Sequence, residues 1–284
     1  MKKTIVRISR IIIKPFLRRG LGQKFPLLRN FFYRQFSPLV VRLASPIEIP
    51  HGHKLYLPPN GVDYVMEPYE EMETELIEKN LKRGGTFIDI GAGVGYHTVI
   101  ASRMVGNGGK VIAFEPEPTS FEYLKKNLKK NNCNNVLLYK LGVADRRGKE
   151  MFYVYDKIGR SRIEPVNSFL NAFQVRKRFE IEMVRVDDVY QGKAAFIKMD
   201  VEGSEYLALQ GMRNLMKNNP QVKLISEVPD YKQSEFFKLL QEWGFTIYEI
   251  NTQNKRLDKI DDPEQFTKEF KNVKRSIGNL FCEK

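Results

Sequence analysis

The sequence has few cysteines and no long apolar run. Its two cysteines, Cys133 and Cys282, are too few for a disulfide framework, and neither has a cysteine or histidine at metal-ligand spacing. Basic residues interrupt the apolar N-terminal stretch, so no window reaches the roughly 18 apolar residues of a membrane-spanning helix. The unbroken run at residues 11–13 is too short for a secretory signal, and no small-residue cleavage site follows it. We therefore expect a cytoplasmic protein that does not span a bilayer.

Acidic residues are absent from the first 47 residues. The same segment holds eleven of the basic residues, so it carries most of the net charge of +13. Excess charge confined to one terminal segment indicates the partner of that segment and not the fold of the remainder. We place a division near Ser45-Pro46, with a basic amphipathic N-terminal extension at residues 1–46 and the main domain at residues 47–284.

The extension has the pattern of a helix that lies on a membrane. At 100° per residue, basic side chains fall opposite an apolar side formed by Ile5, Ile8, Ile12 and Phe16. Such a helix lies in the interface of an anionic membrane and does not cross it, which makes this a cytoplasmic protein with peripheral membrane contact. Two alternatives stay open: an arm packed on the main domain or across a dimer, and contact with nucleic acid through stacked aromatic rings.

From residue 86 onward, strand-like and helix-like segments alternate. The expected strands are residues 86–90, 110–114, 136–141, 195–199, 222–226 and 245–250. The expected helices are residues 98–104, 118–131, 204–216 and 233–243, preceded by a hairpin at 47–57 and a helix at 69–81. Strands separated by helix-length segments require right-handed crossovers. The sequence therefore predicts an α/β fold with a doubly wound, mostly parallel sheet and helices on both faces.

A glycine turn follows the first expected strand. Gly91, Gly93 and Gly95 alternate, Asp89 stands two residues before them, and Tyr96 follows directly. A nicotinamide-binding fingerprint would need its third glycine at the position of Tyr96, and a phosphate loop would need Gly-Lys-Ser/Thr, which is absent. The turn lets the backbone approach a ligand closely. Asp89 suits a cationic ligand such as S-adenosylmethionine, which carries an amine and a sulfonium.

The ends of the next two strands complete the expected cofactor site. In a doubly wound sheet, ligands bind beyond the carboxyl ends of the strands, and an acid after the second strand receives the ribose hydroxyls. Glu115, followed by Pro116, stands at that position. Val143 lies near the following strand end, where an adenine ring should stack, although an ordinary exit from a strand explains this segment nearly as well.

The fourth strand ends in three acids within six residues: Asp200, Glu202 and Glu205. They should repel one another unless they face a cation, a metal ion or the amides of a helix N-terminus. Asp200 and Glu202 are candidates for contact with the substrate, the cofactor or a divalent cation. Glu205 fits an acid in the first turn of a helix equally well.

Three motifs in this order resemble the FkbM family of S-adenosylmethionine-dependent methyltransferases. They are residues 87–98, 111–116 and 197–205, and the resemblance covers about residues 84–230. Members of that family generally methylate hydroxyl oxygens on sugars, polyketides and other natural products. The resemblance implies that the first two motifs bind the cofactor and that the acidic motif lies at the methyl-transfer centre. Gly93 departs from the pattern, because many relatives have asparagine there.

The expected reaction is an in-line displacement in which an acceptor hydroxyl attacks the sulfonium methyl. A neutral hydroxyl is a poor nucleophile, so a base or a divalent cation should lie close to it. Asp200 and Glu202 suit either role. His97, just after the glycine turn, is an alternative base, although a histidine there is more often a packing residue. We expect His51 and His53 in the hairpin to be structural.

Two other function classes stay open. The high pI, near 9.5, favours a methyltransferase that binds RNA, but the excess bases are confined to the extension. The Asn/Asp-Pro-Pro-Tyr/Phe motif of exocyclic amino methyltransferases is absent, as is a cysteine placed for methylation of base carbons. A non-catalytic relative that binds the cofactor is the third class. We expect a small-molecule, glycan or lipid-linked acceptor, with nucleic acid the weaker alternative.

Overall fold

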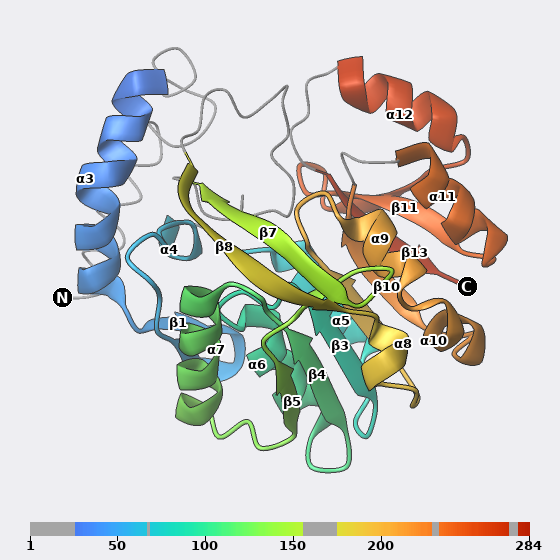
Figure 1. The fold of residues 1–284 in the computed structure, drawn as a ribbon, viewed down its shortest axis with the longest axis horizontal. Helices are drawn as coiled ribbons and strands as arrows, with labels where there is room; N and C mark the ends of the chain where they lie inside the picture. Colours follow the sequence, from blue (N-terminus) through green and yellow to red (C-terminus); the bar gives the residue numbers. More distant parts are fainter. Residues whose placement is uncertain (1–25, 67–68, 156–174, 229–232, 273–277) are drawn as a thin grey trace.

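The computed structural model describes residues 26–66, 69–155, 175–228, 233–272 and 278–284. A central eight-stranded sheet holds the fold together (Figure 1). From one edge to the other, its strands are β12 (Arg256–Lys259), β11 (Thr246–Asn251), β13 (Asn279–Glu283), β10 (Lys223–Glu227), β9 (Phe196–Met199), β3 (Thr86–Ile90), β4 (Lys110–Phe114) and β5 (Val136–Tyr139). The amphipathic helix predicted in the N-terminal extension, with its apolar side of Ile5, Ile8, Ile12 and Phe16, lies outside the described residues.

Five neighbouring strands of the sheet are parallel, from β10 through β9, β3 and β4 to β5. The chain moves outward from β3 to β4 and β5 on one side and from β9 to β10 on the other. The order therefore reverses between β3 and β9, and this is the doubly wound, mostly parallel sheet that the sequence predicts. The strand β13 was not predicted: it inserts antiparallel between β10 and β11.

Helices cover both faces of the sheet. On one face, α9 (Glu205–Gln210), α10 (Arg213–Asn218) and α11 (Gln233–Glu242) pack against the side chains of Ile88 and Ile197. On the other face, α5 (Glu71–Asn80) and α6 (Tyr96–Val105) pack against Phe87 and Phe196. The alternation of neighbouring strand residues between the two faces follows from the pleat of a strand and explains why these strands are apolar throughout.

The helix expected at residues 204–216 is two helices, and this part of the prediction is wrong. The chain turns at Gly211, between α9 and α10, where a Cβ atom would overlap the carbonyl oxygen of Ala144. The sequence does not reveal this break, because apolar residues recur at helical spacing on both sides of it. Both helices present these residues to the same face of the sheet.

A second, three-stranded sheet lies across the front of the central sheet in Figure 1. It has the order β6 (Gly142–Val143), β8 (Val175–Val184) and β7 (Gly148–Tyr155), with β7 and β8 antiparallel. No strand was predicted for β7 or β8, because much of this pair is exposed and charged; Lys149 and Glu180, for example, pair across it at 2.8 Å. Its apolar side packs through Phe152, Ile181 and Met183.

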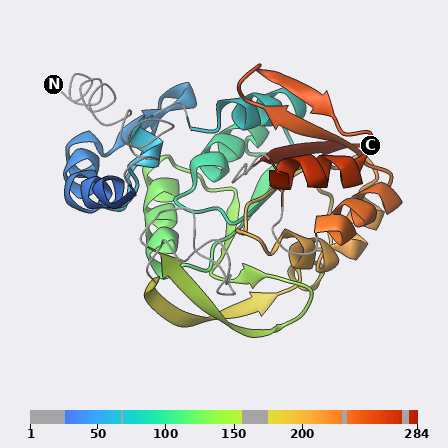
Figure 2. The same ribbon diagram turned by 90° about the horizontal axis from the view of Figure 1, so that it is seen from above.

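The N-terminal part of the described chain is a helix and a hairpin. The helix α3 (Pro26–Ala44) lies at one end of the molecule (Figure 2). After it, β1 (Ile47–Ile49) and β2 (His53–Leu55) form the predicted antiparallel hairpin. Val40, Val41 and Ala44 of α3 are buried in one cluster with residues of the hairpin and of the main domain. The division predicted near residue 46 therefore separates segments that pack together. None of the described helices combines the length and apolar character needed to cross a membrane.

Candidate active site

The candidate site lies where the strand order reverses, between β3 and β9. The glycine turn leaves β3 and the acidic loop leaves β9, so the two segments are neighbours at the carboxyl edge of the sheet. Gly91 has a φ of 81°, and a Cβ atom there would overlap the carbonyl oxygen of Asp200. Only glycine fits at this position, both for its backbone conformation and for its contact with the acidic loop.

The middle glycine of the turn has a different environment. Gly93 has a φ of 55°, and the nearest atom to a Cβ atom there would be the hydroxyl of Tyr64 at 3.4 Å. Asparagine visits this left-handed region more readily than most residues. The backbone of the turn is therefore compatible with the asparagine that the family resemblance leads us to expect here, and glycine leaves the space beside Tyr64 open.

Glu115 connects the end of β4 to the glycine turn. Its Oε2 accepts a hydrogen bond from the Gly93 amide at 2.7 Å, and its Oε1 accepts one from the Glu117 amide at 2.8 Å. Burial raises the pKa of Glu115 to about 8, against these two amides, which lower it. Its assignment to the cofactor ribose stays a prediction, as do those of the adjoining Pro116 and of Val143, which is buried in β6.

Asp89 is the buried penultimate residue of β3, and its Oδ2 accepts a hydrogen bond from the Thr98 hydroxyl at 2.5 Å. Burial raises its pKa to about 6, although the nearby ammonium of Lys198 favours the ionised form. The contact of Asp89 with the cofactor amine stays a prediction. Tyr96 begins α6, and its ring packs edge-on against Tyr69, with 5.1 Å between the ring centroids.

Lys198 is a buried cation that the sequence analysis missed. Its Nζ lies 3.1 Å from Oδ2 of Asp200 and 3.5 Å from Oε2 of Glu70. Burial alone would lower the pKa of Lys198, but Asp200, Glu70 and Asp89 raise it well above its ordinary value. A lysine inside an otherwise apolar strand is the signal that could have identified it, because a buried charge needs a partner.

His97 belongs to the same network. Its Nδ1 lies 3.5 Å from Oε2 of Glu70, and its Nε2 lies 3.4 Å from the hydroxyl of Thr74. Burial, and then the charge of Lys198, lower the pKa of His97 well below its ordinary value, so the ring is neutral at pH 7. Its role as a base stays a prediction, since the ring is buried among α5 and α6 residues.

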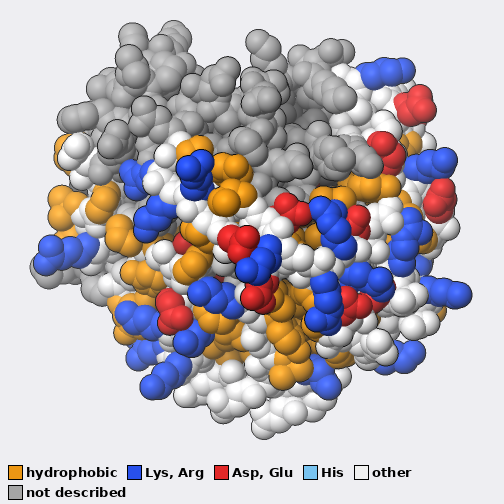
Figure 3. All heavy atoms as spheres, viewed as in Figure 1, with side chains coloured by type: hydrophobic (Ala, Val, Ile, Leu, Met, Phe, Trp, Pro, Cys, Tyr) orange, Lys and Arg blue, Asp and Glu red, His pale blue; other side chains and the backbone are white. Residues whose placement is uncertain are grey.

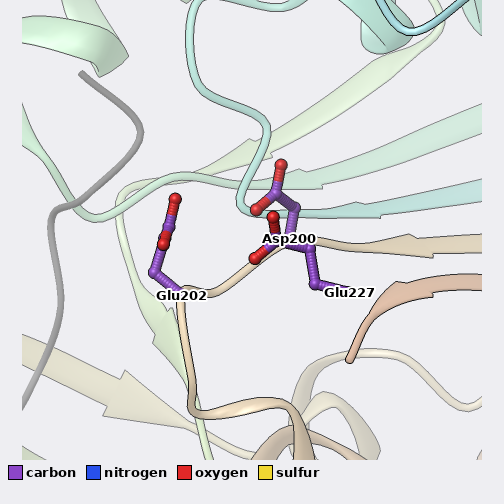
Figure 4. A group of neighbouring side chains, drawn as sticks. All are labelled: Asp200, Glu202 and Glu227. Carbon is purple, nitrogen blue, oxygen red and sulfur yellow. The ribbon is translucent and has the colours of Figure 1, made fainter. Parts of the chain in front are cut away.

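Three half-buried carboxylates form a cluster beside the glycine turn: Asp200, Glu202 and Glu227 (Figure 4). One oxygen from each lies within 4.8 Å of the others. Glu227, at the end of β10, was missed, although its position after the next expected strand fits the rule that sites form at strand ends. Burial, followed by the neighbouring carboxylates, raises the pKa of Glu227 well above its ordinary value.

The cluster suits two kinds of chemistry. A carboxylate there can receive the proton of an acceptor hydroxyl, and three carboxylate oxygens are also ligands that a hard divalent cation prefers. Glu202 has a left-handed backbone with a φ of 51°, a conformation that costs energy for a residue other than glycine. Lys198 already neutralises part of the negative charge at Asp200.

Glu205 has a different setting from Asp200 and Glu202. It is the first residue of α9 and fully buried, and its Oε1 accepts a hydrogen bond from the Gly203 amide at 3.0 Å. Burial raises its pKa to about 7. These contacts organise the acidic loop, which fits the first-turn position considered from the sequence; a direct catalytic role for Glu205 stays a prediction.

Two tyrosines that precede the main sheet complete the surroundings of the turn. The rings of Tyr64 and Tyr69 stack with 4.2 Å between their centroids, and the Tyr64 hydroxyl faces Gly93. Burial raises the pKa of both phenols, so both hydroxyls keep their protons at neutral pH. These tyrosines were not predicted as part of the site, because they belong to no motif and lie before the first strand of the sheet.

A switch-point site with this glycine turn, this strand-end acid and a mostly parallel sheet defines a Rossmann-like methyltransferase domain that uses S-adenosylmethionine. The family model of the methyltransferase FkbM domain matches residues 89–258, more than half of the chain. The chain belongs to the FkbM methyltransferase family, as the three motifs indicated.

Similar proteins include methyltransferases with different acceptors. A protein-L-isoaspartate O-methyltransferase of Methanococcus maripaludis is 34% identical over 132 residues, covering 44% of this chain and 57% of that protein. A "Probable cobalt-precorrin-6B C(15)-methyltransferase (decarboxylating)" of Saccharolobus solfataricus is 27% identical over 175 residues, covering 56% of this chain and 87% of that protein. Among solved structures, methyltransferase FkbM of Methylobacillus flagellatus has a TM-score of 0.44 and 16% identity, covering 78% of this chain and 52% of that one.

Proposed function

We propose that this protein transfers the methyl group of S-adenosylmethionine to a hydroxyl oxygen of a sugar, a glycolipid or another natural product. The observation that carries this proposal is the carboxylate cluster of Asp200, Glu202 and Glu227 beside the glycine turn. A hydroxyl acceptor must lose its proton as it attacks, and the cluster supplies an acceptor for that proton next to the cofactor turn.

The residues divide the work between positioning and proton transfer. The glycine turn and Glu115 hold the cofactor, and much of the rate comes from the alignment of the hydroxyl with the methyl group. The departing thioether needs no acid. The buried Lys198 orients Asp200 through their ion pair, while Asp200 or Glu202 receives the acceptor proton.

The acceptor can be found by comparing metabolites and glycolipids of a deletion strain with those of its parent. We expect one species of the parent to be replaced in the deletion strain by a species that is lighter by one methyl group. The parental species should return when the wild-type gene is returned. Returning the gene with Asp200→Asn should leave the lighter species in place. A deletion strain whose hydroxylated metabolites and glycolipids match those of the parent would contradict the proposal.

With the acceptor in hand, purified variants test the cluster. Asp200→Asn and Glu202→Gln should lower turnover by about 10²–10⁴-fold, the usual contribution of a positioned base, with little loss of cofactor affinity. The matched control is Glu180→Gln, an acid of the exposed pair on β8, which should keep full turnover. Full turnover in both cluster variants would show that the catalytic centre lies elsewhere.

The same assay separates the two roles of the cluster. If EDTA abolishes turnover and magnesium restores it, the carboxylates hold a metal ion that binds the acceptor oxygen. If turnover is indifferent to EDTA, a carboxylate acts as the base.

A methyltransferase that acts on RNA is the second candidate, favoured by the eleven lysine and arginine residues of the extension. Transfer of a labelled methyl group into total RNA, and not into small hydroxylated molecules, would support it. Cofactor binding without transfer to any acceptor would indicate the non-catalytic relative.

A further inference from the structure

The helix α3 is apolar on its buried face and again on part of its exposed face. Its inner face is buried against the domain through Ser37, Val40, Val41 and Ala44, and the Ser37 hydroxyl donates a hydrogen bond to the carbonyl oxygen of Pro59 at 3.2 Å. Its outer face exposes Phe36, Leu39 and Leu43, at fractions of 41%, 52% and 41%. Among the described residues, six large hydrophobic side chains are exposed, and this helix carries half of them.

An outer face of this kind is unusual for a surface helix. A helix packed on a domain by one stripe normally presents charged and polar residues to water on the opposite side. The helix α7 (Pro118–Lys130) does so, with exposed lysines at positions 125, 126, 129 and 130. Within residues 35–44, four of the six exposed positions of α3 are apolar, Phe36, Pro38, Leu39 and Leu43, and the other two are Gln35 and Arg42. Figure 3 shows hydrophobic side chains along this edge of the molecule, with basic side chains beside them.

The charge of the segment identifies the partner. The helix α3 has no acidic residue, and the first 47 residues of the chain have eleven bases. A membrane surface with anionic lipids combines negative charge with an apolar layer at headgroup depth, which matches exposed leucines flanked by bases. A nucleic acid would use the bases and aromatic rings but would leave the leucines in water.

We propose that the outer face of α3, formed by Leu39, Leu43 and the flanking Arg42, docks on an anionic lipid surface. The leucines enter the boundary between headgroups and acyl chains, and the basic residues contact the lipid headgroups. The inner face fixes this surface rigidly to the domain, since Val40, Val41 and Ala44 share a buried cluster with Ala92 and Val94 of the glycine turn.

Flotation of the full chain with lipid vesicles tests the proposal. The vesicles contain phosphatidylserine and phosphatidylcholine in equal parts, and pure phosphatidylcholine vesicles are the lipid control. The double variant Leu39→Glu/Leu43→Glu should lower vesicle affinity at least tenfold. The matched control is Leu137→Glu, which changes a leucine of similar exposure, 49%, on the edge strand β5 and should float like the wild type. Calorimetric titration with S-adenosylmethionine confirms that each variant is folded.

The outcomes are distinct. Docking through α3 requires flotation with the anionic vesicles that decreases with added salt and is lost in the double variant. Equal flotation of the wild type and the double variant would overturn the proposal, because the membrane contact would then lie elsewhere in the chain. It is also overturned if the wild type ignores both kinds of vesicle, and binding of single-stranded RNA that survives in the double variant would then assign the basic segment to nucleic acid.

Discussion

Affinity for S-adenosylmethionine should depend on pH through Glu115. Its pKa of about 8 means that, at pH 7, about nine tenths of the free protein carries a proton on this carboxyl group. In the predicted contact, the two ribose hydroxyls of the cofactor donate to the ionised carboxylate of Glu115, so that proton must leave when the cofactor binds. Removal of this proton at one pH unit below the pKa costs about 1.4 kcal/mol of binding free energy, which is a factor of about ten in affinity. Ionisation of Glu115 alone should therefore raise the affinity about tenfold between pH 7 and pH 9.

Other groups titrate in the same range, and a variant separates them. The cofactor amine has an ordinary pKa of about 8, and Asp89, with a pKa of about 6, contributes at lower pH. In Glu115→Gln these groups remain and the Glu115 step is lost, so the ratio of wild-type to variant affinity isolates the effect. This ratio should increase about tenfold from pH 7 to pH 9.

Calorimetric titration in two buffers of different ionisation enthalpy measures the released proton directly. At pH 7 the wild type should release close to one proton more than Glu115→Gln on binding the cofactor. A wild-type to variant ratio that stays constant across this pH range, with equal proton release, would refute the assignment of Glu115 to the ribose.

The remaining predictions concern the network around the turn. Asp89→Ala should weaken cofactor binding roughly ten- to a hundredfold in calorimetry, because it removes a charged hydrogen bond of about 1.5–3 kcal/mol; unchanged affinity would mean that Asp89 serves the fold alone. Lys198→Met should lower the free energy of unfolding by about 3–5 kcal/mol in denaturant titration, because it leaves the carboxylates around Lys198 without their cation. The control Lys149→Met, on the surface, should change the free energy of unfolding little. Equal effects of the two substitutions would argue against the network. Gly91→Ala should destabilise the protein more than Gly244→Ala, because the two have φ values of 81° and 79° but only Gly91 also meets a neighbouring backbone; equal melting temperatures would contradict this contact.

Local patterns were sufficient to predict the part of the fold that surrounds the candidate site. The strands β3, β4 and β9 are short apolar runs that end in a motif, and a strand buried on both faces leaves this signature in any context. The strand β13 was missed although it is as apolar as the others, because its place between β10 and β11 depends on pairing across a long stretch of sequence. The pair β7 and β8 was missed because its exposed charged residues dilute the strand pattern.

The candidate site divides in a similar way. Asp200 and Glu202 belong to one motif and were identified from it, whereas Glu227 joins them from another strand and Glu70 reaches Lys198 from the start of α5. A single sequence names the members of a motif, but the partner that each charge meets depends on which strand ends become neighbours. Tyr64 had no sequence signal, because its relevance comes entirely from its position over Gly93.

The placement of β13 affects the order in which the sheet can form. The hairpin of β11 and β12 is synthesised before β13, yet it joins the sheet through β13 and has no direct pairing with β10. During synthesis this hairpin must therefore wait with an unpaired edge, and non-local pairing of this kind slows folding and exposes edges to aggregation. Cys282, the fourth residue of β13, is fully buried once the strand is inserted. Its protection from a thiol reagent would therefore time the moment at which the sheet closes.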